Sequence, residues 1–245
     1  MEQDKILLKV EALMNLYRSG GLGGEIMPED ENPGLDRASK ENYMYFTLPM
    51  ALNYQRSSYA LWASANRMFA EESMVFDSRA VCDMPDMDLR EILVKYKVAL
   101  QPNKQPVIWK KLCETIETNL MGDIRNLFRN QGNSVSAIKA HITQNRKAYP
   151  YLAGNKICNY WLYVMEQYTD VRFVDRENIT VAPDTHVIQA SVKLGLVSPE
   201  EAARTDIQQV IADRWKKLLA GTPFVPIDVH TPLWLWSHGK FSVEL

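Results

Sequence analysis

The sequence predicts an all-α protein, folded as an irregular helical bundle in two lobes with a cleft between them. Apolar residues recur at three- and four-residue steps along most of the chain, which is the spacing of one face of an α-helix. The sequence shows no sustained alternation of apolar and polar residues, and residues 170–181 contain the only short β-like pieces. These patterns favour helices packed on helices around a common core.

The helices can be placed in order along the chain. The face of the first helix is formed by Ile6, Val10, Leu13, Met14 and Tyr17. Residues 19–35 are rich in glycine and proline and are expected to form a flexible loop, because neither a lysine–serine pair nor a preceding strand supports a phosphate-binding loop. An apolar helical stretch covers residues 42–72, with Pro49 expected near a helix start or a kink. Further helices are expected over residues 88–100, 106–120, 123–130, 134–146, 156–169, 185–195, 199–219 and 230–237.

The composition is that of a globular protein. We expect one helical domain over residues 1–245, with lobes formed by residues 1–40 plus 150–245 and by residues 41–149. No apolar run approaches the roughly 20 residues of a membrane span, and the first residues lack the basic start of a secretory signal. Cys82, Cys113 and Cys158 are scattered, which fits a reducing cytoplasm. The four histidines lack metal-ligand spacing, so we expect neither a metal nor a cofactor. We also expect a cytoplasmic monomer.

The charge is close to neutral, at −2, which argues weakly against a nucleic-acid partner because phosphate binding depends on lysine and arginine. The average conceals an asymmetry. Residues 1–40 carry eight acidic residues against five basic ones, whereas residues 104–172 carry ten basic residues against five acidic ones. A basic face opposite an acidic one is therefore compatible with the sequence.

The segment Tyr149-Pro-Tyr-Leu-Ala-Gly-Asn-Lys156 predicts a hairpin between two helices. One helix ends near Lys147, the chain turns through Pro150 and Gly154, and the next helix starts near Asn155. The backbone N–H groups at such a start can hold a phosphate. Lys156 lies in this first turn among apolar and aromatic neighbours, and a lysine half-desolvated there is more easily held as a neutral, nucleophilic amine. The alternative is an ordinary surface lysine.

Asp184 follows Pro183 and precedes a helix whose apolar positions are Val187, Ile188, Val192 and Leu194. Aspartate at this place is well suited to cap the helix. Capping does not exclude a catalytic function, because a capping carboxylate is held rigidly at the helix start.

The run Pro226-Ile-Asp-Val-His-Thr-Pro-Leu-Trp-Leu-Trp236 has the groups that suit a pocket for a nucleobase. Aromatic faces stack on bases, and Trp234 is the candidate for this role, with core packing as the alternative. Asp228 and His230 imitate an Asp-x-His signature, but the Lys-Leu-Gly-Leu run that follows Asp184 does not follow Asp228. Asp184 is therefore preferred as the catalytic carboxylate, and Asp228 as a reader of a purine edge.

These segments together resemble the helix-hairpin-helix DNA glycosylase superfamily, which includes endonuclease III and the 8-oxoguanine glycosylases. The hairpin ending at Lys156 is similar to the family's Leu-Pro-Gly-x-Gly-x-Lys turn, and residues 183–196 are similar to its Val-Asp-Thr-His and Leu-Gly-Leu run. Residues 50–58 match the early helix whose turn reaches into DNA. The hairpin lacks the second glycine and the spacing from Lys156 to Asp184 is long, which resembles the archaeal 8-oxoguanine glycosylase branch. No cysteine follows Cys158, so the iron–sulfur loop of endonuclease III is absent from the sequence.

The resemblance implies a two-lobed glycosylase-like fold with a helix-hairpin-helix and a central cleft, and a DNA N-glycosylase with AP-lyase activity, nucleoid-associated if the source is a prokaryote. Lys156 attacks the sugar of an extruded damaged base, with 8-oxoguanine favoured, and Asp184 stabilises the positive charge on the sugar. Trp234, Asp228 and His230 form the base pocket. The residues expected to contact duplex DNA are Gln55, Arg56, Leu152, Gly154, Asn155, Lys139, Arg146 and Lys147.

Two other functions fit the sequence. The first is an N-glycosidase of the same superfamily that acts on a nucleotide or nucleoside, which the low net charge and the missing hairpin glycine favour. The second is a non-catalytic helical DNA-binding protein that has the hairpin without the chemistry. Both enzymes need the chemistry assigned to Lys156 and Asp184, whereas the binding protein does not.

Overall fold

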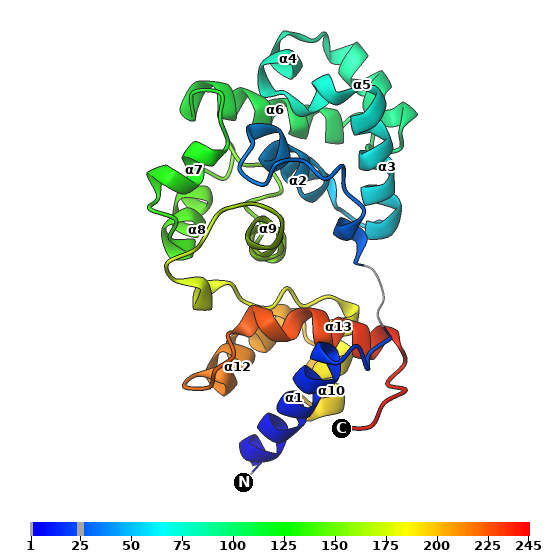
Figure 1. The fold of residues 1–245 in the computed structure, drawn as a ribbon, viewed down its shortest axis with the longest axis vertical. Coiled ribbons are helices and arrows are strands. Elements are labelled where there is room, and N and C mark those ends of the chain that lie inside the picture. The colour runs from blue at the N-terminus through cyan, green and yellow to red at the C-terminus, as the bar shows by residue number, and fades with distance from the viewer. Residues whose placement is uncertain (1, 24–26) are drawn as a thin grey trace. The chain divides into compact units, whose positions relative to one another are not determined.

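The computed structural model describes residues 2–23 and 27–245, and every regular element in these ranges is helical, which confirms the all-α prediction (Figure 1). The α-helices are α1 (Glu2–Arg18), α2 (Lys40–Leu52), α3 (Ser58–Glu71), α4 (Ser78–Asp83), α5 (Asp86–Lys95), α6 (Gln105–Asn119), α7 (Arg125–Asn130), α8 (Val135–Gln144), α9 (Asn155–Tyr168), α10 (Thr185–Leu194), α11 (Pro199–Ala202), α12 (Ile207–Leu219) and α13 (His230–His238). The 3-10 helices are η1 (Pro28–Asp30), η2 (Ser73–Phe76), η3 (Arg176–Asn178) and η4 (Pro226–Val229).

Two local predictions need correction. Pro49 lies inside α2, near its C-terminal end, where it deprives the helix of one backbone hydrogen bond, so only the alternative of a helix start is excluded for this proline. The β-like residues 170–181 form no strand, because the N–H groups of Asp170 and Val174 donate to the carbonyls of Arg37 and Asn133, which lie in loops. The glycine-rich loop after α1 falls partly on residues 24–26, outside the described residues.

The chain divides into two compact units. We call Ile26–Asp175 the central unit, and Met1–Glu25 together with Arg176–Leu245 the terminal unit. The lobes expected from the sequence had their junctions near residues 40 and 150 instead. The difference arises because α9 packs against α2, which places the hairpin and Lys156 in the central unit.

The central unit is built around α2, whose residues from Asn42 to Leu52 are all buried. A helix that is buried all round needs neighbours on every side, and α2 packs against α3, α6 and α9 (Figure 1). Buried tryptophans join α9 to α2 and α6 to η2 by hydrogen bonds. Trp161 on α9 donates to Thr47 on α2, and Trp109 on α6 donates to the carbonyl of Val75.

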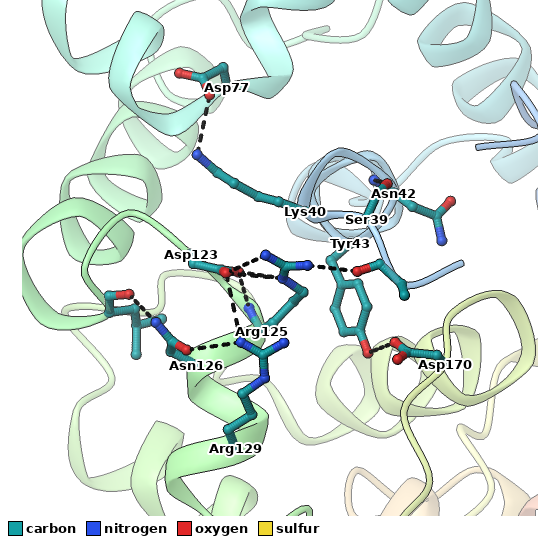
Figure 2. A network of polar contacts seen from close by, with 12 residues as sticks. Ser39, Lys40, Asn42, Tyr43, Asp77, Asp123, Arg125, Asn126, Arg129 and Asp170 are labelled. Carbon is teal, nitrogen blue, oxygen red and sulfur yellow. Dashed lines mark hydrogen bonds and ion pairs between the residues drawn. The ribbon is translucent and has the colours of Figure 1, made fainter. Parts of the chain in front are cut away.

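A polar network fixes the start of α2 (Figure 2). Arg125 donates to the carboxylate of Asp123 and to the carbonyl of Ala38, just before the helix. Lys40, in the first turn, pairs with Asp77 at 3.2 Å. These contacts join the start of α2 to α4 and α7, so the position of α2 is set by a long-range ion pair and a hydrogen bond as well as by apolar packing.

The terminal unit has its own core, contributed by α1, α10, α12 and α13. Trp215 is fully buried, and its indole N–H donates to the Ser191 hydroxyl on α10. Trp236 is also buried and donates to the carbonyl of Val243. Two of the three C-terminal tryptophans are therefore core residues. Trp234, which lies between them in the sequence, is half-buried.

None of the helices in the described ranges is both long enough and apolar enough to cross a membrane.

Candidate active site

The predicted hairpin connects α8 to α9, and backbone hydrogen bonds within the hairpin occupy several of its N–H groups. The N–H groups of Leu152, Ala153 and Gly154 donate to the carbonyls of Pro150, Tyr149 and Tyr151. The amides of Leu152 and Gly154, expected from the sequence to grip a phosphate, are therefore engaged inside the turn. This corrects the expected mode of phosphate binding.

The helix start that follows is less occupied. α9 begins at Asn155 as predicted, and its capping residue is Gly154, which supplies no side-chain hydrogen bond. The amides of Lys156 and Ile157 in the first turn thus receive no side-chain cap. A helix start without a side-chain cap attracts anions. These two amides therefore replace those of Leu152 and Gly154 as the candidates for phosphate contact.

Lys156 is exposed, which differs from the expected half-desolvation. The reason is its position on α9. The buried face of that helix is formed by Cys158, Trp161, Leu162 and Met165, and a residue two positions before Cys158 points to the opposite side. The apolar neighbours in sequence therefore pack into the core and leave the amine in water.

The three basic residues expected to help at the hairpin differ in their environment. Arg146 and Lys147 are exposed between α8 and α9. Lys139 is half-buried, and its amine donates to the side chain of Asn159 at 3.1 Å; Asn159 in turn donates to the carbonyl of Asn155. Lys139 thus joins α8 to the first turn of α9, where Lys156 lies.

Asp184 caps α10 as predicted. Its carboxylate accepts a hydrogen bond of 3.0 Å from the Val187 amide, and the side chain is half-buried. The Leu-Gly-Leu run ends the same helix: Gly195 has a left-handed φ of 82°, and the Leu196 amide donates to the carbonyl of Ser191. The segment that carries the family resemblance is thus a helix with both ends fixed.

His230 supports the approach to Asp184. It is buried, and its Nδ1 accepts a hydrogen bond of 3.4 Å from the amide of Ala182, two residues before Asp184. His230, which was expected from the sequence to face a base, therefore also supports the segment that leads to Asp184.

Trp234 belongs to an aromatic cluster with two histidines. Its ring lies parallel to that of His238, with centroids 4.5 Å apart, and meets His186 edge-on at 5.2 Å. His186 is in the first turn of α10, and its Nδ1 lies 3.3 Å from the Ser237 hydroxyl. α10 and α13 therefore bring Trp234 and the start of the Asp184 helix together in the terminal unit.

Asp228 is engaged by other partners. One carboxylate oxygen pairs with Arg176 at 2.7 Å, and the other accepts a hydrogen bond of 2.9 Å from the amide of Val225. These contacts fix η4 to η3. Contact with a purine edge would require the Arg176 pair to open, so the structure gives Asp228 an anchoring position within the terminal unit.

Gln55 lies at the tip of the loop between α2 and α3. It is exposed and has a left-handed φ of 50°. Its neighbour Arg56 is half-buried and donates to the carbonyls of Lys97 and Val98 at 2.8 and 2.7 Å. Arg56 therefore holds the loop, whereas Gln55 is presented to solvent.

Glu29 is a feature that local sequence patterns do not reveal. This carboxyl is buried in η1 and accepts a 2.6 Å hydrogen bond from the Tyr160 hydroxyl, one turn after Lys156 on α9. Its second oxygen has no hydrogen-bond partner within the described residues. Burial raises the pKa of Glu29 to about 7, against the hydrogen bond from Tyr160, which lowers it. The two residues are 131 positions apart, so only the fold brings them together.

A cavity of about 580 Å³ lies between α5 and α6 in the central unit. Its lysines are paired with acidic residues, Lys110 with Asp86 and Lys111 with Glu114. The residues singled out from the sequence do not line it, and it has no aromatic surface for a base. The cavity is thus separate from the candidate site.

The site residues form two groups. Gln55, Lys156 and Glu29 belong to the central unit, whereas Asp184 and Trp234 belong to the terminal unit. Comparison of the sequence with protein-family models and with curated proteins finds no match in either.

Proposed function

We propose that the protein is a DNA N-glycosylase with AP-lyase activity that removes a damaged purine, 8-oxoguanine first among them, from duplex DNA. The observation that carries the proposal is the capping geometry of Asp184. Stabilising the positive charge on the sugar needs an anionic carboxylate held in one orientation. The hydrogen bond from the Val187 amide holds the Asp184 carboxylate in this way. His230 and the ends of α10 hold the same segment from other sides.

The chemistry assigned to Lys156 follows from its place at the start of α9. After losing a proton, the amine attacks C1′ of the deoxyribose while the bond from C1′ to the base nitrogen breaks and the base leaves with that electron pair. The C1′–O4′ bond of the resulting aminal then breaks, O4′ takes a proton and the sugar ring opens to a Schiff base, from which loss of a C2′ proton eliminates the 3′ phosphate. Asp184 stabilises the positive charge that develops on the sugar and accepts the proton from the amine. The uncapped amides of Lys156 and Ile157 support this assignment as a place for the adjacent phosphate.

The remaining roles concern the flipped base. Trp234 offers an aromatic surface beside the Asp184 helix, in a cluster with His186 and His238. Gln55 fills the space that the base leaves, a role supported by its exposure at a loop tip that Arg56 holds in place.

The test is release of 8-oxoguanine from a duplex oligonucleotide by Asp184→Asn. Asparagine caps a helix about as well as aspartate, so this variant removes the charge and keeps the fold. We expect its rate of base release to fall by about 100-fold or more, the scale for loss of one electrostatic contact to a transition state. Asp213→Asn, an exposed aspartate on α12, is the matched control and keeps the wild-type rate.

Other results lead to the other functions. Hydrolysis of free nucleosides or nucleotides without action on duplex DNA would identify an N-glycosidase for small substrates. DNA binding without base release from any damaged substrate would identify a non-catalytic binding protein. Equal base release by the wild type and Asp184→Asn would contradict the assignment of Asp184.

A further inference from the structure

The corner of the central unit that presents Gln55 also presents an aromatic and basic surface, formed by Tyr54, Tyr151 and Lys104. The rings of Tyr54 and Tyr151 meet edge to face at 5.4 Å. The amine of Lys104 lies over both, 5.7 Å from the Tyr54 centroid and 5.3 Å from that of Tyr151. Tyr54 is 42% exposed, so much of its ring remains accessible to a ligand.

Three segments that are distant in sequence meet at this corner. They are the α2–α3 loop (residues 53–58), the turn before α6 (residues 97–104) and the hairpin (residues 145–156). Contacts of Tyr54 and Lys104 with Tyr151, and of Arg56 with Lys97, join them. The three segments contain no acidic residue, and their basic residues are Arg56, Lys97, Lys104, Arg146, Lys147 and Lys156. This charge complements a polyanion, in a protein whose net charge is −2.

The surface is held in a fixed conformation. Gln55, Lys97 and Tyr151 all have left-handed backbones, with φ of 50°, 59° and 63°. For residues other than glycine this conformation is unfavourable, and it persists where surrounding contacts impose it, often at functional sites.

Two side chains hold the α2–α3 loop and the turn before α6 in place. Arg56 binds the carbonyls of Lys97 and Val98. Gln105 is buried; it donates to the carbonyl of Leu52, and its side-chain oxygen accepts hydrogen bonds from two amides of the preceding turn. A ligand that stacks on Tyr54 therefore meets a preorganised surface and costs little conformational entropy.

We infer that Tyr54, Tyr151 and Lys104 bind an unpaired base of single-stranded DNA, with the base stacked on Tyr54 and its phosphate paired with Lys104. The inference rests on the proposed function, because extrusion of a damaged nucleotide by a glycosylase leaves the opposite base unpaired. Aromatic rings beside basic side chains are the usual means of holding single strands without regard to sequence. A hydrogen bond with Tyr151 raises the pKa of Lys104, so its ammonium keeps the charge that a phosphate requires.

The test measures binding of the full chain to a short single-stranded oligonucleotide by fluorescence anisotropy, which requires no base excision. Tyr54→Leu should weaken binding by about 5- to 150-fold, the range for one lost stacking contact. Tyr17→Leu is the matched control, because Tyr17 is 38% exposed and lies in the terminal unit; we expect it to bind as the wild type does. Equal affinities for wild type, Tyr54→Leu and Tyr17→Leu would overturn the inference.

A second measurement uses the wild-type chain alone, so it does not depend on the folding of a variant. Photo-crosslinking of an oligonucleotide that contains 5-iodouracil should attach it to Tyr54 or Tyr151, identified by mass spectrometry. Crosslinks confined to other residues would overturn the inference. Single-strand binding through Tyr54 without release of 8-oxoguanine would refute the proposed function alone, and release of 8-oxoguanine with no contact at Tyr54 would refute this inference alone.

Discussion

Replacement of the buried Glu29 by glutamine should change how the stability of the protein depends on pH. Burial raises the pKa of this carboxyl from its ordinary 4.5 to about 7 in the folded state. A raised folded-state pKa means that Glu29 contributes its full stability below pH 4.5, and that this contribution is lost as the pH rises through 7. The two pKa values correspond to a loss of about 3 kcal/mol in the free energy of unfolding across this range.

Glutamine does not titrate, and its side-chain oxygen can still accept the hydrogen bond from Tyr160. Its amide leaves an unpaired donor where the wild type has an unpaired oxygen, but this effect is the same at every pH. The informative quantity is therefore the change in the stability difference with pH. We expect the Glu29→Gln variant to gain about 3 kcal/mol relative to the wild type between pH 4 and pH 8.

Urea unfolding at a series of pH values, followed by circular dichroism, measures this difference. Glu91→Gln on α5 removes an exposed carboxylate and controls for the change in net charge. Tyr160→Phe should move the loss of stability to higher pH, because the hydrogen bond from Tyr160 lowers the pKa of Glu29. A stability difference between Glu29→Gln and wild type that stays constant from pH 4 to pH 8 would refute the reasoning.

Three further variants test the positions that hold the site. Asp184→Ala should lower stability by about 1 kcal/mol in urea unfolding, through loss of the α10 cap, whereas Asp184→Asn should not. Gly195→Ala should lower stability by about 1 kcal/mol, because alanine is disfavoured at the left-handed φ of 82°. No atom crowds an added Cβ, so this cost comes from the backbone alone, and an unchanged unfolding midpoint would show that the C-cap is dispensable. Gln55→Gly should raise stability by about 1 kcal/mol by relieving a left-handed backbone while weakening binding to lesion-containing duplex, and a loss of stability would contradict the assigned strain.

The sequence predicts most of the local structure because short-range signals specify it. Gly154 and Asn155 mark the start of α9 and Asp184 marks the start of α10; the structure confirms both, and it shows that Gly195 caps the end of α10. Each signal acts through the backbone of its own helix, within a few residues. The positions of these helices can therefore be predicted from the local sequence alone.

The features that the sequence does not predict depend on contacts between distant segments. Glu29 is buried against Tyr160, and the pairing of Asp228 with Arg176 involves a residue 52 positions away. The exposure of Lys156 depends on which face of α9 packs into the core, which its immediate neighbours do not determine. Likewise, the surface around Tyr54 requires three separate segments to meet.

The most direct test of the proposed chemistry is borohydride trapping on duplex DNA that contains 8-oxoguanine. Reduction of a Schiff base between the protein and the deoxyribose gives a stable covalent adduct. We predict an adduct with the wild type and with Lys217→Gln, an exposed lysine on α12 that serves as control, and none with Lys156→Gln. A trapped adduct of equal yield in Lys156→Gln, or the absence of an adduct from the wild type on every damaged-base substrate, would contradict the assignment of Lys156 as the nucleophile.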